Sequence, residues 1–357
     1  MGPFEREVGA ELLIETARLW RSLGHHDTDG RFRIDGVTGP DEYSAIADNN
    51  VYTNLMAQQN LTAAADVVAR QTEVAERLGV SEEEAASWRD AATAMLIPYD
   101  SRRGVHPQSE RFTDHARWDF AQTPPDKYPL LLHYPYFDLY RKQVVKQADL
   151  VLAMHLQGHA FTPEQKDRNF TYYEAVTVRD SSLSASTQAI MAAELGHMEL
   201  AHQYLGEAAL VDLADLWHNT ADGLHMASLA GGWAALVAGF GGMRARDHQL
   251  SFAPRLPPGI TRLAFRVRYR GRRIMVTARR DEATFELLEG PPIEIVSHGE
   301  RLTLGDGSGD GGNGGGGNGG KAIRQPIPPL APKPAPTQPL GREPHRREPG
   351  PGANHEH

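Results

Sequence analysis

The segment 31-RFRIDGVTGPDEYSAIADNNVYTNLMAQQNL-61 decides the fold, because a loop of turn-forming residues runs directly into a long helical pattern. Two adjacent carboxyl groups, Asp41 and Glu42, follow the rigid Gly39-Pro40 turn. From Asn50 onward, apolar residues recur at three- and four-residue spacing, which predicts a helix. The same spacing continues through most of residues 4–242, with one helix expected over residues 50–78. Ser81 and Thr162 are predicted N-caps, and a helix break is expected near Gly196 or Leu205. We therefore expect consecutive helices joined by polar loops, with the two carboxyl groups on one of these loops.

The apolar period changes from helical to alternating after residue 250. Apolar and basic side chains alternate around Arg270-Gly271, which indicates a β-hairpin with one buried face. Consecutive helices followed by a small all-β piece favour an α-toroid capped by a β-sandwich. We expect a helical domain at 1–248 and a β domain at 249–304. Residues 305–357 are predicted to be a disordered tail, because their glycines and prolines leave no apolar face to bury.

Composition excludes several classes of protein. The 357 residues carry a net charge of −9 and show no basic face, so nucleic acid is not an expected partner. The chain contains no cysteine, which excludes disulfides and suits a cytoplasmic location. No apolar run approaches the ~20 residues that a membrane-spanning helix needs, and the N-terminus does not resemble a signal peptide. Neither metal-ligand spacing nor a dinucleotide fingerprint occurs, so we expect no metal and no cofactor.

Glu42 is a candidate general acid. Its backbone is restrained by Pro40, and its neighbours are Asp41 and Tyr43. A carboxyl group that a neighbouring negative charge and partial burial keep protonated can donate a proton near neutral pH. The pentapeptide alone favours a plainer interpretation, a turn that carries two solvated acids.

Lys146 and Gln147 are candidates for binding a ligand. They lie on a helix that the spacing predicts over residues 136–156, where polar pairs interrupt an apolar stretch. Such pairs could reach into a pocket, and they could equally form a solvated stripe.

Hydroxyl groups before a predicted helix form a candidate anion site. Ser181 and Ser182 come just before a predicted helix start, with Arg179 beside them. Backbone N–H groups at a helix N-terminus favour anions, although a plain N-cap explains the serines almost as well. His225 follows a polar loop, and alone it is more often a satisfied core histidine than a functional one.

Five segments, taken in order, give a specific resemblance. They are DGVTGPDEY with DNNVYTNLMA, VVKQADLV, YYEAVTVRDSSLS, NTADGLHMASLAGGW and GFGGMRARDHQLSFAPRLP. From about residue 4 to residue 304, the chain resembles glycoside hydrolase family 65, the inverting phosphorylases of maltose, trehalose, kojibiose and related α-glucosides. The resemblance implies a mainly α fold, a partial (α/α)6 toroid barrel followed by a small antiparallel β-sheet domain of the sandwich type. Members of the family are about twice as long, so the resemblance is to their C-terminal half.

The resemblance also implies roles for the candidate residues. Glu42 would be the general acid, with Asp41 in the substrate-binding set beside it, tuning or positioning the acid. Lys146 and Gln147 would bind the glucose that is cleaved. The phosphate site would consist of Ser181, Ser182 and His225. The implied reaction is phosphorolysis of an α-linked disaccharide of the maltose, trehalose, kojibiose or nigerose type, with inorganic phosphate as co-substrate and β-glucose 1-phosphate and glucose as products.

Two alternatives stay open. A hydrolase of the same fold would need a second carboxylate as base, and Asp180 and Glu174 are the candidates in that loop. An inactive fragment or one part of a split enzyme is the other alternative, because half a toroid exposes an apolar wall. Such a wall would require a homodimer or a separate chain that supplies the N-terminal half. Specificity for the leaving glucose is expected from the loop His106–Trp118.

Overall fold

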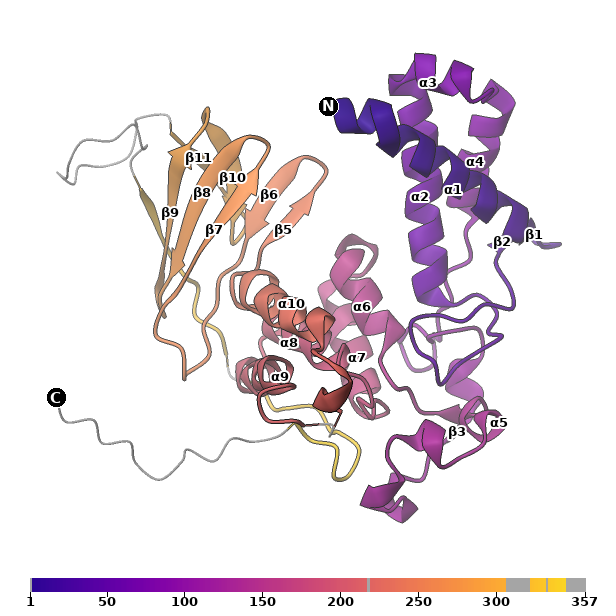
Figure 1. Ribbon diagram of the computed structural model, residues 1–357, viewed down its shortest axis with the longest axis vertical. Coiled ribbons are helices and arrows are strands. Elements are labelled where there is room, and N and C mark those ends of the chain that lie inside the picture. Colours follow the sequence, from indigo (N-terminus) through magenta and orange to yellow (C-terminus); the bar gives the residue numbers. More distant parts are fainter. Residues whose placement is uncertain (1, 217–218, 306–321, 332, 345–357) are drawn as a thin grey trace. The chain divides into compact units, whose positions relative to one another are not determined.

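The computed structural model describes residues 2–216, 219–305, 322–331 and 333–344, which divide into two compact units (Figure 1). The first unit runs to Asp180 and includes Gln338–Gly341, and the second begins at Ser181. The described chain is mainly helical, with the sheets concentrated in its C-terminal region, as predicted. Within these ranges, no helix is both long and apolar enough to cross a lipid bilayer.

The first unit begins with helices around an apolar core. They are η1 (Glu5–Gly9, π-helical), α1 (Ala10–Leu23), α2 (Val51–Arg70), α3 (Thr72–Arg77) and α4 (Glu82–Ala94). Helices α1, α2 and α4 pack side by side (Figure 1) around a core whose largest member is the buried Trp88. The Ser81 side chain accepts a hydrogen bond from the Glu84 N–H and begins α4, as predicted. Gln71 separates α2 from α3, which the sequence pattern had joined in one helix.

The remainder of the first unit is loop-rich. Its elements are β1 (His25–His26), β2 (Phe32–Arg33), η2 (Phe112–Asp114), β3 (Ala116–Arg117), η3 (Phe120–Gln122), η4 (Pro125–Lys127), η5 (Leu130–Leu132), α5 (Tyr136–Leu139), β4 (Lys142–Gln143), α6 (Asp149–Leu156), η6 (Gly158–Ala160) and α7 (Pro163–Glu174). Thr162 and Gln165 form a reciprocal capping box at the start of α7, which confirms the cap predicted at Thr162. The loops between helices are held by these short strands and turns.

The single helix predicted over residues 136–156 is wrong. That stretch contains the short helix α5, the strand β4 and then α6, so Lys146 and Gln147 lie in an extended segment before a helix. The backbone of Val145 exchanges hydrogen bonds with Val176 and Val178, and β4 pairs in parallel with β3. Tertiary pairing of β-branched residues therefore overrides the helical spacing.

The helices of the second unit are α8 (Ser184–Leu195), α9 (Met198–Leu210), η7 (Thr220–Asp222), α10 (Met226–Ala234) and η8 (Ala235–Phe240, π-helical). Gly196 ends α8 with a φ of 91°, which confirms the predicted break there. A Cβ atom on Gly231 would lie 2.5 Å from Ser186 Oγ, and one on Gly239 would lie 3.3 Å from Ile190 Cα. The later glycine, Gly239, thus lies beside the later residue of α8, Ile190, and the earlier glycine, Gly231, beside the earlier one, Ser186. Helix α8 therefore runs parallel to α10 and η8, and their N-termini lie at the same end.

Two four-stranded sheets follow, with strand orders β11-β10-β6-β5 and β12-β9-β8-β7. The strands are β5 (Arg244–Arg246), β6 (Gln249–Phe252), β7 (Leu263–Tyr269), β8 (Arg272–Ala278), β9 (Glu282–Glu289), β10 (Ile293–Ser297), β11 (Glu300–Leu304) and β12 (Ile323–Pro326). Arg270 and Gly271 both have positive φ and form the predicted hairpin turn between β7 and β8. Phe252 of one sheet and Phe285 of the other share one core, as in a sandwich. The β region begins at Arg244, because β5 pairs with β6.

The predicted disorder of residues 305–357 is wrong for part of that range. Residues 306–321, 332 and 345–357 lie outside the described residues. Strand β12, however, pairs antiparallel with β9 and completes the second sheet. The buried Gln325 donates hydrogen bonds to Ser297 O (3.0 Å) and Glu300 Oε2 (2.9 Å), so β12 also joins the two sheets. The segment contributes an edge strand although its composition resembles a linker.

Replacing Gln325 with alanine should lower the free energy of unfolding by about 1–3 kcal/mol, because two acceptors of the other sheet lose a donor. Urea unfolding followed by circular dichroism measures this change. Arg324→Ala is the matched control, since Arg324 lies next to it on β12 with an exposed side chain. Equal effects of the two substitutions would show that β12 is not held by Gln325.

Candidate active site

Glu42 lies at the surface of the first unit and forms an ion pair with Lys146. The Lys146 Nζ lies 2.5 Å from Glu42 Oε2, and 56% of the Glu42 side chain is exposed. The partial burial predicted for Glu42 is therefore wrong. The structure does bring together the predicted acid and the predicted sugar-binding lysine, which are 104 residues apart in sequence.

Asp41, its neighbour, is completely buried and faces the interior. Its Oδ1 accepts hydrogen bonds from the N–H groups of Lys146 (2.8 Å) and Tyr43 (3.2 Å), and its Oδ2 accepts one from Gln108 Nε2 (2.7 Å). Both carboxylate oxygens are thus engaged by the protein. The place of Asp41 among the substrate-binding residues stays a prediction. We assign it to holding residues 39–43, which we call the acid loop.

A second buried carboxyl group, Asp149, holds the acid loop from below. Its Oδ1 accepts the Asp41 N–H (2.6 Å), and its Oδ2 accepts a hydrogen bond from Asn50 Nδ2 (2.8 Å). Asn50 in turn caps α2 by accepting the Thr53 N–H. A Cβ atom on Gly39 would collide with Asp149 Oδ2 and lie 2.6 Å from Asn50 Nδ2. The loop therefore requires glycine at position 39, because the side chains of Asp149 and Asn50 lie too close to its backbone for a Cβ atom.

Burial dominates the electrostatics of these two carboxyl groups. Loss of solvent raises the pKa of Asp41 to about 6, against the opposing effect of its hydrogen bonds. Burial, together with the negative charge of Asp41, raises the pKa of Asp149 well above its ordinary value. The pair therefore resists carrying two negative charges near neutral pH.

Gln147 and Tyr43 attach the acid loop at two further points. Gln147 Nε2 donates a hydrogen bond to the Pro40 carbonyl oxygen. The Tyr43 hydroxyl donates to Asp180 Oδ2 (2.6 Å), which also accepts the Leu130 N–H. Burial, and then the charge of Asp180, raise the pKa of Tyr43, so the phenol stays neutral. Lys146 and Gln147, both predicted as ligands, lie against the acid loop.

The predicted phosphate-site residues lie in the second unit, at the end where α8 and α10 begin. Ser181 and Ser182 are half-buried and precede α8, and the Ser181 Oγ accepts the Leu183 N–H (3.2 Å). His225 is the N-cap residue of α10. The two helix starts present backbone N–H groups at the same end, which suits an anion. The Ser181 contact also fits the plain capping interpretation.

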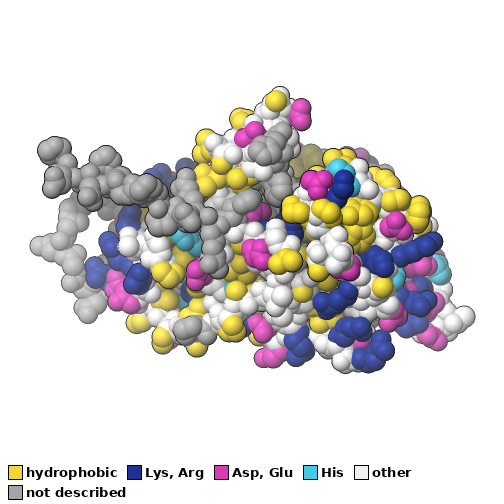
Figure 2. All heavy atoms as spheres, turned by 90° about the horizontal axis from the view of Figure 1, so that it is seen from below, with side chains coloured by type: hydrophobic (Ala, Val, Ile, Leu, Met, Phe, Trp, Pro, Cys, Tyr) yellow, Lys and Arg dark blue, Asp and Glu magenta, His cyan; other side chains and the backbone are white. Residues whose placement is uncertain are grey.

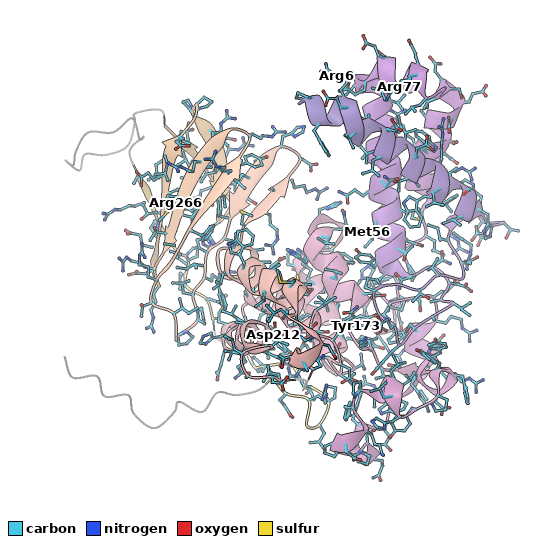
Figure 3. All side chains as sticks on the ribbon, in the orientation of Figure 1. Arg6, Met56, Arg77, Tyr173, Asp212 and Arg266 are labelled. Atoms are coloured by element: carbon cyan, nitrogen blue, oxygen red, sulfur yellow. The ribbon has the colours of Figure 1, made fainter. Side chains whose placement is uncertain are left out.

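Asp212, which follows α9 and is labelled in Figure 3, fixes the histidine ring. It accepts the His225 N–H (2.9 Å), and its Oδ1 lies 2.6 Å from His225 Nδ1. The hydrogen bond from His225 lowers the pKa of Asp212, so the carboxylate is ionised at neutral pH. Because His225 Nδ1 is hydrogen-bonded to Asp212, Nε2 is the nitrogen of the His225 ring that can contact a ligand.

An open pocket of about 440 Å³ lies elsewhere in the first unit. It is bordered by Tyr99, by arginines and carboxylates between Leu96 and Asp114, and by Arg31. Its lining includes part of the loop His106–Trp118, but no predicted site residue. The role of this loop in specificity stays a prediction. Among the described residues, no group of three or more histidine and acidic side chains could hold a metal ion.

Three residues that support the candidate site are not among the predicted site residues: Gln108, Asp149 and Asp212. Asp149 belongs to the KQAD motif and directly follows the lysine, glutamine and alanine, so its place in the motif was a usable signal. Gln108 carries no signal of its own, since its role depends on a contact 67 residues away in sequence. Asp212 is likewise recognised only through His225.

Comparison with known protein families decides the relationship. Residues 2–234 match the model of the glycosyl hydrolase family 65 central catalytic domain, and residues 243–304 match the family's C-terminal domain. The chain belongs to glycoside hydrolase family 65. The predicted resemblance is thereby confirmed.

Individual relatives agree with this family. The chain is 56% identical over 347 residues to an uncharacterised glycosyl hydrolase of Mycobacterium tuberculosis strain H37Rv, covering 97% of this chain and 43% of the relative. It is 42% identical over 314 residues to an alpha,alpha-trehalose phosphorylase of Thermoanaerobacter brockii, covering 85% and 41%. A solved structure from the human microbiome, provisionally named a kojibiose phosphorylase, superposes with a TM-score of 0.81 at 26% identity, covering 92% and 47%. The chain thus spans less than half the length of these relatives.

Replacing Gly39 with alanine should destabilise the first unit by about 1–3 kcal/mol, because the new methyl group must displace Asp149 or Asn50. Thermal unfolding measures the loss. Gly9→Ala is the matched control, since a Cβ atom there meets nothing closer than 3.5 Å. If Gly39→Ala were as stable as the control variant, the close packing of the acid loop on Asp149 would be disproved.

Proposed function

We propose that this chain acts in the inverting phosphorolysis of an α-linked glucose disaccharide. The observation that supports this best is the contact between Glu42 and Lys146, which brings the predicted acid to the predicted sugar-binding lysine, while Asp41 and Tyr43 on either side of Glu42 are buried. It places a solvent-accessible carboxyl group beside a cation and a glutamine, side chains that can hydrogen-bond sugar hydroxyls. Family membership supports the same reaction class.

In this proposal Glu42 is the general acid and protonates the glycosidic oxygen as the bond to the leaving glucose breaks. Lys146 and Gln147 bind the glucose that is transferred. Phosphate, bound by Ser181, Ser182 and His225, attacks the anomeric carbon from the opposite face. The configuration inverts, and the products are β-glucose 1-phosphate and glucose. The phosphate is already an anionic nucleophile, so no cofactor is involved.

The alternative of a hydrolase requires a base that activates water. Both candidates for that base are buried in the first unit. Asp180 accepts hydrogen bonds from the Tyr43 hydroxyl and the Leu130 N–H, and Glu174 accepts one from Gln338 Nε2 (2.9 Å). A carboxylate that protein donors already occupy is poorly placed to take a proton from water. These contacts favour phosphorolysis over hydrolysis.

We propose trehalose as the first substrate to test among maltose, trehalose, kojibiose and nigerose. The support is the 42% identity to a relative named as an alpha,alpha-trehalose phosphorylase. Figure 2 shows Lys and Arg side chains as well as Asp and Glu side chains on the face that it draws. A cytoplasmic location stays a prediction from the cysteine-free sequence.

Substituting Glu42 by glutamine should abolish the formation of glucose 1-phosphate, because the amide cannot donate the required proton. The assay incubates the purified chain with each disaccharide, with and without inorganic phosphate, and measures glucose and glucose 1-phosphate. Glu76→Gln is the control, since Glu76 is exposed on α3. Glucose release that is independent of phosphate would support the hydrolase instead. Silence with every sugar would support the inactive fragment.

We also propose that further polypeptide covers one face of η1 and α1 in the active assembly. This face carries a stripe of large apolar residues, each of which is more than half exposed: Phe4, Val8, Leu12, Leu19 and Leu23. Their spacing places them along one side of the helix. A stripe of this kind is typical of a helix–helix interface. A second copy of the chain, or a separate chain that supplies further helices, could cover it.

The purified chain should self-associate through this stripe, and a double substitution of Leu12 and Leu19 by lysine should reduce the association. Size-exclusion chromatography with light scattering at several protein concentrations measures the molar mass. Leu132→Lys is the control, because Leu132 is 75% exposed but lies outside the stripe. A monomeric wild-type chain would contradict the expectation of self-association.

A further inference from the structure

The acid loop owes its position to a small set of buried contacts. Glu42 contacts Lys146 near the surface, where 56% of the Glu42 side chain and 20% of the Lys146 side chain are exposed. Asp41, by contrast, contacts the backbone of Lys146 in the interior, where its Oδ1 accepts the Lys146 N–H. The geometry of the surface pair is therefore set by what lies beneath it.

One side chain connects these buried contacts. Asp149 is the first residue of α6 and is 1% exposed. Its two carboxyl oxygens accept the Asp41 N–H and the Asn50 amide, while its own N–H donates to Gln108 Oε1 (3.3 Å). Gln108 in turn donates to Asp41 Oδ2. The acid loop, the start of α2 and the start of α6 are joined at this one residue.

We propose that Asp149 is the positioning residue of the acid loop: through Asp41 and Asn50 it fixes where Glu42 meets Lys146. It does not touch the reacting atoms, so it acts only through these neighbours. The proposal deepens the proposed function and rests on it for the identity of Glu42 as the acid. The contacts of Asp149 exist whether or not that identity is correct.

The hold of Asp149 on the loop depends on protonation. Two carboxyl groups that are both buried and close enough to repel cannot ionise together at low cost. Burial and the charge of Asp41 raise the pKa of Asp149 well above its ordinary value, so the folded pair resists losing its last proton. When the last proton leaves at higher pH, repulsion between Asp41 and Asp149 opposes the contact between Asp149 and the Asp41 N–H. The loop should therefore loosen as the pH rises.

The other groups that face the pair do not titrate in the same range. Burial raises the pKa of Tyr52 on α2 and of Tyr173 on α7, which is labelled in Figure 3, and the charge of Asp149 raises both further. Burial likewise raises the pKa of Tyr43. These three phenols stay neutral between pH 6 and 8. Lys146 and Glu42 face the pair from the surface and form an ion pair with each other. The proton-dependent change of the loop that is expected as the pH rises is thus assigned to Asp41 and Asp149.

Hydrogen–deuterium exchange of the whole chain tests this proposal without requiring catalysis. Asp149→Ala removes both acceptor oxygens, and exchange of the amides in residues 39–47 and 145–150 should become about tenfold faster. Asp149→Asn keeps one acceptor for the Asp41 N–H but places its NH2 group against the Asn50 Nδ2 donor, so it should restore part of the protection. Asp66→Asn on α2 is the matched control, because its side chain is 55% exposed and should change neither segment.

The pH dependence gives a second readout, which a purely structural role would not produce. After correction for intrinsic exchange, protection of residues 39–47 in the wild-type chain should fall as the pH rises above 6. In Asp149→Asn this fall should disappear, because the neutral amide cannot ionise. If Asp149→Ala does not fold, this comparison still decides the proposal, and Asp41→Asn repeats it from the other side of the pair.

Two results would overturn the positioning role: unchanged exchange in residues 39–47 of Asp149→Ala, or the same pH dependence in Asp149→Asn as in the wild type. Phosphorolysis is measured on the same samples. If the wild type is active, Asp149→Asn should lower kcat more than it changes KM and shift the alkaline limb of the rate profile to higher pH. A wild type without activity counts against the proposed function, whereas the exchange data still test Asp149.

Discussion

The buried contact between Asp149 and the acid loop is the constraint on which the first unit depends. A buried carboxyl group is costly unless hydrogen bonds satisfy it, and here the donors come from segments far apart in sequence. Asn50 caps α2 and Gln108 belongs to a loop, yet both direct their amide groups to this pair. Satisfying Asp41 and Asp149 therefore requires the helix starts and the loop to assemble together. The same assembly brings Asp149 and Asn50 so close to Gly39 that a Cβ atom would not fit there.

The carboxyl groups near this loop divide into two kinds, and the division bears on the chemistry. Asp41, Asp149, Glu174 and Asp180 are buried, and each accepts hydrogen bonds from the protein. Glu42 is exposed and meets a cation instead. A reaction that needs one acid and no base needs one available carboxyl group, whereas hydrolysis with inversion needs two. The proposed anion site, with its hydroxyls and imidazole, would replace the second carboxylate.

Features that depend on local sequence could be predicted. The caps at Ser81 and Thr162, the break at Gly196 and the turn at Arg270-Gly271 each follow from the residues at that point, and each was found. The helix expected over residues 136–156 was not found, because Val145 pairs with a strand segment more than 30 residues away. Gln325 shows the same limit in the tail, since its partners lie on the opposite sheet. Spacing cannot reveal such contacts between distant segments.

Adjacent residues in the acid loop have opposite environments, and this explains why the sequence places two carboxyl groups side by side. The Asp41 side chain points inward, where its Oδ1 accepts the N–H groups of Tyr43 and Lys146. Glu42, with its longer side chain, extends to the surface. One carboxyl group can then anchor the backbone while the next is presented to a ligand. Reading both as solvated, or both as catalytic, misses this division, because burial separates them and sequence spacing does not.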